Sequence, residues 1–321
     1  MANNHEPEAS RAAREFCLRY NVVSGPSLQP DAQVIELIAH GMESFSNALG
    51  LATRDNLIPV EEPAWALVRA MILRGFAHAD AGFVCLATGA VSTVEVVSRV
   101  VLESALNVLY ILEQDRVCRL YDYLAGYVTQ ERTELTRWEE MLGRMPPEEA
   151  TVHRKEIERK QQAVDQQESI VQEFAGSAGI TRPRRPWPKI ADRFRAIGNE
   201  VDYRVLYVAM CSQTHNDAED LFNTFMLGAM AHLHPGQVAR EFEMRQKAEN
   251  AFFARLLLYR SIEYLFQCFE RYGESYAVPA IADIGSRCYR TMRELASELC
   301  KSEQHERDRF RAAIGPLPFN T

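Results

Sequence analysis

One stretch, Thr93 to Leu112, constrains the fold of this chain more than any other. Its residues, TVEVVSRVVLESALNVLYIL, are apolar over most of a helical circumference, but Glu95, Arg99, Glu103 and Asn107 recur at every fourth position. This spacing aligns the four polar side chains in one narrow line along a helix. Because an unpaired ion in an apolar interior costs several kcal/mol or more, we expect this line to be paired or functional, on a helix at the centre of the protein.

The remaining sequence is also helical in pattern, with no sustained alternation of apolar and polar residues that would indicate strands. It predicts an all-α, multi-helix bundle. Two polar segments with apolar residues about seven apart flank a turn at 143–147, which predicts a protruding antiparallel helical hairpin at 115–175. Two roles for this hairpin stay open: a solvated spacer, or a contact with a second copy of the chain or another protein partner.

The predicted organisation has three parts. An N-terminal helical segment covers 1–60, a helical bundle covers 61–305, and a C-terminal tail covers 306–321. The bundle includes the hairpin and, at 176–189, a basic proline-rich loop whose closely spaced prolines exclude helix.

Composition narrows the functional classes. A net charge of −8 provides no global attraction to nucleic acid or anionic membranes, so a phosphate partner requires a local basic patch. The seven cysteines are scattered without a paired motif, as in reduced cytoplasmic proteins. The longest uncharged run, 221–239, is interrupted by His232, His234 and Pro235 before it reaches the roughly 20 apolar residues of a membrane span. We therefore expect a cytoplasmic protein without a membrane span.

A second candidate segment follows at 203–217. On a helix, Ser212 and His215 share a face, and Tyr207 precedes His215 by eight residues on the same side. Imidazole titrates near neutral pH, which makes His215 the histidine best placed for proton transfer. The alternative is that Ser212 and His215 only cap a helix or satisfy core hydrogen bonds.

These segments together resemble a known family. Three motifs occur in an order similar to that of a bacterial all-helical family of unknown function. They are R-x-x-x-E with Arg99 and Glu103, a Trp187-Pro188 segment before a short helix, and S-x-x-H with Ser212 and His215, preceded by Tyr207. The resemblance covers roughly residues 65 to 235. It implies a helical bundle with a shared pocket built from Arg99, Glu103, Ser212 and His215.

More distantly, the pattern resembles the HEPN-like helical domains of toxins and phage-defence proteins, many of which are metal-independent ribonucleases. The nearest local counterpart of their R-x4–6-H motif is Arg74 to His78, one residue shorter. The resemblance therefore implies that Arg99 and His215 meet from different helices. His215 would then move a proton, Arg99 would stabilise phosphate charge and Glu103 would orient one of them.

The basic loop is a candidate nucleic-acid contact. Its cationic and aromatic side chains could grip phosphates and stack a base; they are Arg182, Arg184, Arg185, Trp187 and Lys189. The alternative is a solvated linker. His232 and His234 with His215 and Asp217 do not match a metal-ligand motif, so we expect no metal and no cofactor.

Two functional hypotheses follow. The first is an RNA- or nucleotide-directed protein, nuclease-like and metal-independent, in a toxin or phage-defence setting, with Arg99, Glu103, Tyr207, Ser212 and His215 as the catalytic group. The second is a non-catalytic binding or regulatory protein in which the same polar cluster holds helices together.

Overall fold

The computed structural model describes residues 30–58, 63–214 and 237–314, and its architecture is the expected all-α bundle. The elements follow the chain as α2 (Ala32–Arg54), α3 (Pro63–Ala87), α4 (Val91–Glu113), α5 (Arg116–Leu142), α6 (Pro147–Ser177), α7 (Ile190–Ala196), α8 (Glu200–Asp202), a π-helical turn η2 (Tyr203–Tyr207), α9 (Val208–Thr214), α11 (Gln237–Ser275) and α12 (Pro279–Ile314). Within the described ranges every regular element is a helix.

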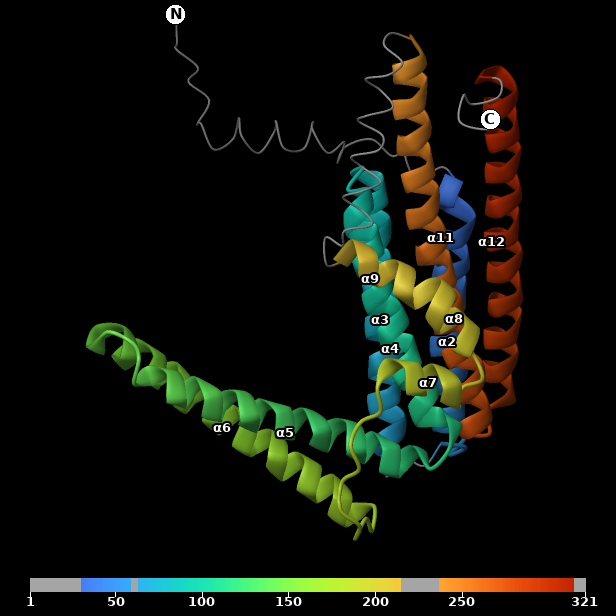
Figure 1. The fold of residues 1–321 in the computed structure, drawn as a ribbon. Helices are drawn as coiled ribbons and strands as arrows, with labels where there is room; N and C mark the ends of the chain where they lie inside the picture. Colours follow the sequence, from blue (N-terminus) through green and yellow to red (C-terminus); the bar gives the residue numbers. More distant parts are fainter. Residues whose placement is uncertain (1–29, 59–62, 215–236, 315–321) are drawn as a thin grey trace, which may run out of the picture.

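The long helices α2, α3, α4, α11 and α12 run side by side and form the body of the bundle (Figure 1). Helix α4 contacts α3 on one side and α11 on another, and α7 and α9 also pack on it. The expectation that the polar line lies on a central helix is confirmed, since most apolar side chains of α4 are fully buried.

Aromatic rings from helices distant in sequence fill the core. Phe45 of α2 stacks on Phe269 of α11 with ring centroids 4.2 Å apart, and Phe76 of α3 contacts Phe269 and Phe266. These contacts place α2 and α3 in the same core as α11. The domain boundaries proposed from sequence stay predictions, although α12 continues as a helix through the one proposed at 305–306.

The predicted hairpin is confirmed. Helices α5 and α6 lie antiparallel and project from the body (Figure 1). The apolar line on α6 packs inside the hairpin: Ile157, Val164 and Val171 form a small core with Val128 and Leu135. Arg132 reaches across to Asp165 at 2.6 Å. The seven-residue spacing thus serves the contact between the two arms of the hairpin.

By length and composition alone, one helix in the described part of the chain could cross a membrane, the segment Ala64–Ala87. This segment is α3, which packs against α4 and α11 in the bundle. Gly75 and Gly82 on α3 lie directly against Leu265 and Leu258 of α11. Core helices of soluble proteins pass the same test, so length and composition alone do not assign this helix to a membrane.

Candidate functional site

The polar line on α4 meets partners from the segment 190–207. Arg99 donates from Nε to Glu103 Oε1 at 2.8 Å, as expected for residues four apart. Further along the same helix, Asn107 accepts a hydrogen bond from Arg193 of α7, and at its other end Glu95 is buried. The prediction that this line is paired is therefore met at Arg99, Glu103 and Asn107.

Tyr207 completes a triangle with the α4 pair. Its hydroxyl donates to Glu103 Oε1 at 2.8 Å and accepts from Arg99 Nη2 at 2.9 Å. The guanidinium of Arg99 also lies 5.1 Å from the centre of the Tyr207 ring. Three of the five residues predicted as one catalytic group, Arg99, Glu103 and Tyr207, thus lie together; we call them the α4 cluster.

The turn η2 sets the position of Tyr207. The π-helical backbone of Tyr203–Tyr207 turns the tyrosine ring onto α4, where it stacks beside Tyr203 with centroids 5.8 Å apart. Phe194 of α7 supports both rings from the core. Single π-helical turns inside helices are frequent at functional sites, so this turn directs attention to Tyr207.

The electrostatics of the α4 cluster hold the tyrosine neutral and the arginine charged. Burial raises the pKa of Tyr207 well above its usual value, and the adjacent Glu103 carboxylate raises it further. Burial alone would lower the pKa of Arg99, but the hydrogen bond to Glu103 and the nearby Tyr207 and Cys211 raise it. The side chain of Arg99 remains 22% exposed and that of Glu103 36%, so solvent reaches the cluster.

Arg193 links the α4 cluster to the basic loop. The residue is 8% exposed, and its guanidinium bonds to Asn107 and lies 5.9 Å from the Trp187 ring centre. Burial lowers the pKa of Arg193, while the negative charge of Glu103 opposes this effect. A buried arginine without a carboxylate bonded to it in the described chain is unusual, and here the amide of Asn107 takes that place.

The basic loop is anchored to α5 by one buried carboxylate, Asp122. Arg182 donates to both of its oxygens at 3.0 and 2.8 Å, and the backbone N–H of Arg185 donates to Oδ1 at 2.8 Å. This bidentate pair raises the pKa of Arg182. Of the five loop residues predicted to bind nucleic acid, Arg182 is therefore engaged in holding the loop.

The other four loop residues differ in their surroundings. Trp187 is half-buried, with its ring edge-to-face against Tyr110 at 5.1 Å and Tyr123 at 5.0 Å. Arg185 and Lys189 are exposed, and Arg184 is half-buried. The loop thus presents cations to solvent while its tryptophan packs onto the body.

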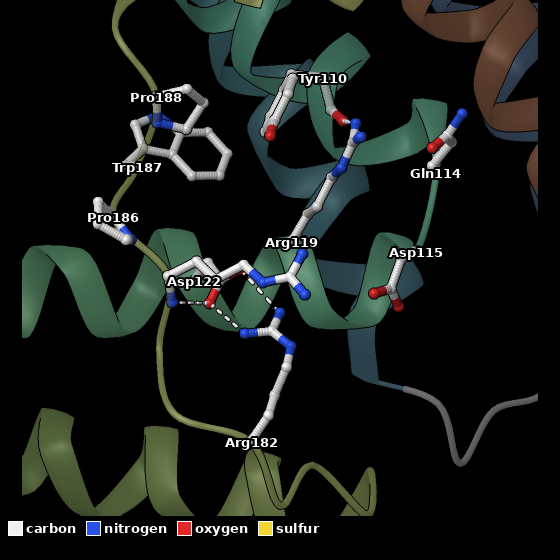
Figure 2. A pocket seen from close by; sticks show the side chains of 10 residues that line it. Tyr110, Gln114, Asp115, Arg119, Asp122, Arg182, Pro186, Trp187 and Pro188 are labelled. Carbon is white, nitrogen blue, oxygen red and sulfur yellow. Dashed lines mark hydrogen bonds and ion pairs between the residues drawn. The ribbon is translucent and has the colours of Figure 1, made fainter.

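A pocket of about 290 Å³ lies where the loop meets the α4–α5 corner (Figure 2). The loop lines it with Arg182, Arg185, Pro186, Trp187 and Pro188, and the helices contribute Tyr110, Gln114, Asp115, Arg119 and Asp122. Figure 2 shows Arg119 extending from α5 toward Tyr110, with Trp187 on the opposite wall. The guanidinium of Arg119 bonds to the Tyr110 carbonyl and lies 4.1 Å from the centre of the Tyr110 ring.

The structure does not describe the side chains of the other two predicted catalytic residues, Ser212 and His215, so their place in the cluster stays a prediction. His215 lies outside the described residues, as do Asp217, His232 and His234. Ser212 lies on α9, five residues after Tyr207, and only its backbone is described. Over the ranges 30–58, 63–214 and 237–314 no group of three or more potential ligand side chains could hold a metal ion.

Sequence reasoning missed three residues: Asp122, Arg119 and Arg193. Asp122 carried no signal in the sequence, because it is two residues from Leu120 and from Leu124, a spacing that places it on the other side of α5 from these apolar residues. Arg119 and Arg193 carried no signal either, since each follows a common pattern of charged residues on a helix. Their partners, the Tyr110 carbonyl and Asn107, appear only in three dimensions.

Comparison with known protein families identifies the family of this chain. Residues 65–228 match the model of a protein family described as a family of unknown function (DUF5677). The matched range contains the α4 cluster, the basic loop and the pocket. No curated protein and no solved structure matches the chain.

Proposed function

The chain belongs to the DUF5677 family, whose function is unknown, and from the geometry we propose that this protein is an RNA-directed, nuclease-like protein of the cytoplasm whose chemistry centres on the α4 cluster. The observation that carries the proposal is the position of Arg99. Glu103 and Tyr207 fix its guanidinium at 2.8 and 2.9 Å, yet its side chain remains 22% exposed. A pre-positioned, accessible guanidinium suits a phosphate whose charge grows during reaction.

The proposed reaction needs no metal. His215 removes the proton from a ribose 2′-hydroxyl, and the freed oxygen attacks the adjacent phosphorus. The bond from phosphorus to the 5′-oxygen breaks, that oxygen takes up a proton from water, and a 2′,3′-cyclic phosphate forms. Arg99 stabilises the added negative charge on the phosphoryl oxygens, while Glu103 and Tyr207 hold Arg99 in place. Ser212 contributes a hydroxyl on the same helical segment.

The other parts of the proposal concern the setting. The exposed cations of the basic loop, Arg185 and Lys189, contact the RNA backbone. The hairpin formed by α5 and α6 serves as the contact for a second copy or a protein partner. A cytoplasmic location agrees with the cysteines, since all six in the described part of the chain are free. A toxin or phage-defence role follows the HEPN-like resemblance.

A cleavage assay tests the proposal. Purified protein is incubated with end-labelled single-stranded RNA in the presence of EDTA, and the products are analysed for 2′,3′-cyclic phosphate ends. We expect cleavage by the wild type and none by His215→Ala at unchanged melting temperature. The matched control is His40→Ala, which alters an exposed histidine on α2 and should retain activity.

The second candidate function is a non-catalytic binding or regulatory protein. One observation favours it: Arg99, Glu103 and Tyr207 satisfy one another in a closed triangle, as in a structural network. In that case the wild type cleaves no RNA, and Arg99→Ala and Glu103→Ala each lower the melting temperature by several degrees.

A further inference from the structure

The pocket at the α4–α5 corner is chemically distinct from the α4 cluster, and nothing above assigns it a ligand. Its volume of about 290 Å³ lies near the lower end of the range for small-molecule sites, which is about 300–1,000 Å³. Such a volume suits one small molecule, whereas several nucleotides of a chain would need an open groove.

The cations of the pocket are only partly neutralised. Arg182 is paired with Asp122 through both oxygens, so these two charges cancel. Arg119 bonds to a neutral carbonyl, and neither Arg119 nor Arg185 forms an ion pair with a carboxylate anywhere in the described ranges. The pocket wall therefore carries two arginines in excess of this pair, opposed by the single exposed carboxylate of Asp115.

Two uncompensated guanidinium groups on one concave wall favour a doubly charged anion. A terminal phosphate carries close to two negative charges at neutral pH and presents three acceptor oxygens. Arginine forms short, directional hydrogen bonds to such oxygens. The backbone N–H of Arg185 already bonds to Asp122, so the loop holds the Arg185 side chain near the pocket whether or not a ligand is present.

The rest of the wall matches the other parts of a nucleotide. Tyr110 and Trp187 supply aromatic surface, which binds a base through its ring face or edge. Gln114 and Asp115 supply an amide and a carboxylate, groups that hydrogen-bond ribose hydroxyls or base amino groups.

We propose that this pocket binds a nucleotide carrying a terminal phosphate, with Arg119 and Arg185 on the phosphate and Tyr110 and Trp187 beside the base. Two sources share this chemistry: a free nucleoside monophosphate and the 5′-phosphorylated end of an RNA strand. The inference goes beyond the proposed cleavage because, apart from Arg185, it rests on side chains that the cleavage proposal does not use. It holds whether or not the α4 cluster cleaves RNA.

Binding to the full-length protein tests this inference by isothermal titration calorimetry in EDTA. The probes are the four nucleoside monophosphates, the corresponding nucleosides, inorganic phosphate, and a short RNA with a 5′-phosphate or a 5′-hydroxyl. The His215→Ala protein is used throughout, so that RNA is not consumed. We expect at least one monophosphate or the 5′-phosphorylated RNA to bind at one site per chain, and the matching nucleoside or 5′-hydroxyl RNA to bind at least tenfold more weakly.

Two variants locate the binding. Arg185→Gln removes an exposed side chain but keeps the backbone N–H that bonds to Asp122, so the loop stays anchored. It should weaken binding about tenfold or more, because the variant lacks one charge-assisted hydrogen bond to the phosphate. Arg184→Gln is the matched control, since Arg184 carries the same charge on the same loop but does not line the pocket. Its affinity should stay within twofold of the parent protein.

Three results would overturn the inference. The first is that no phosphorylated probe binds. The second is that inorganic phosphate binds as tightly as the best nucleotide, which removes the role of the aromatic wall. The third is that Arg184→Gln weakens binding as much as Arg185→Gln does, which would place the anion on the loop surface. Preference for the free monophosphate or for the RNA end identifies the source of the ligand, and either preference supports the site.

Discussion

The hydroxyl of Tyr207 lies 2.8 Å from Glu103 Oε1, joining residues 104 positions apart in the chain. The same hydroxyl accepts a hydrogen bond from Arg99, so one oxygen atom closes the α4 cluster. Because Glu103 accepts both of these bonds at Oε1, the loss of the phenol would remove the bridge between Arg99 and Glu103 and leave only their direct bond within the cluster. Tyr207 therefore fastens the 190–207 segment to α4, together with Arg193, which bonds to Asn107.

Tyr207→Phe should lower the stability of the protein. The substitution keeps the ring and removes two hydrogen bonds to charged groups, and such bonds contribute about 1.5–3 kcal/mol each. Because the site is partly exposed, water replaces part of these interactions in the variant. We expect a loss of about 1–2 kcal/mol and a fall in melting temperature of about 2–4 °C, measured by calorimetry.

The control for this change is Tyr203→Phe. Tyr203 stacks beside Tyr207, but its hydroxyl forms no hydrogen bond with any residue in the described ranges. Its removal should change the melting temperature by less than about 1 °C. Equal effects of the two substitutions would show that the triangle contributes nothing to stability.

How far the sequence predicts this structure depends on how local each contact is. The Arg99–Glu103 pair was predictable because residues four apart on a helix always face the same way. The hairpin was predictable because its apolar residues recur at heptad spacing on both arms. The anchoring of the basic loop was not predictable, because Arg182 and Asp122 lie 60 residues apart. A proline-rich, basic segment is also typical of a solvated linker.

Asp122→Asn should release the basic loop. The substitution removes the charge that Arg182 grips with two bonds, in a side chain that is only 8% exposed. Trypsin should then cut the loop faster. The bond between Arg184 and Arg185 is the one to follow, because Arg182 and Arg185 each precede a proline and resist cleavage. Mass spectrometry of timed digests measures the rate.

Asp115→Asn is the matched control for the loop. Asp115 is an exposed carboxylate on the same pocket wall, and asparagine readily adopts its left-handed backbone, φ 46°. Its digestion rate at the Arg184–Arg185 bond should equal that of the wild type. If Asp122→Asn also leaves this rate unchanged, the carboxylate does not anchor the loop.

The crossing of α11 and α12 depends on two glycines. A Cβ atom on Gly273 would lie 2.2 Å from the backbone nitrogen of Ala282, and one on Gly285 would lie 2.2 Å from that of Glu270. Both obstacles are backbone atoms, so the helices would have to separate. We expect Gly273→Ala and Gly285→Ala each to cost at least about 1–3 kcal/mol in urea unfolding.

Gly50→Ala provides the opposite expectation for the same chemical change. Gly50 lies within α2, and a Cβ atom there meets nothing within 4 Å. Alanine favours the helix over glycine by about 0.5–1 kcal/mol, so this variant should be more stable than the wild type. A stability loss at Gly50 similar to that at Gly273 would mean that the close helix crossing is not the cause.

Glu263 should make stability depend on pH in an unusual direction for an acid. Its side chain is 2% exposed, with Arg260 bonded to it and Arg293 Nε 3.6 Å from Oε1. Burial raises the pKa of Glu263 above 4.5, and this effect exceeds the lowering by Arg260 and Arg293. A carboxyl group whose pKa is raised on folding stabilises the protein below its unfolded pKa, near 4.5, and this contribution is lost as the pH rises through the folded value.

Glu263→Gln keeps the shape without the charge, so its stability relative to the wild type should be greater at pH 7.5 than at pH 4. Urea unfolding at both pH values measures the difference, and Glu294→Gln, the same change on the exposed face of α12, should show no such gain at pH 7.5. If Glu263→Gln instead loses stability relative to the wild type when the pH is raised from 4 to 7.5, the attraction of the two arginines for Glu263 outweighs the cost of burying its charge.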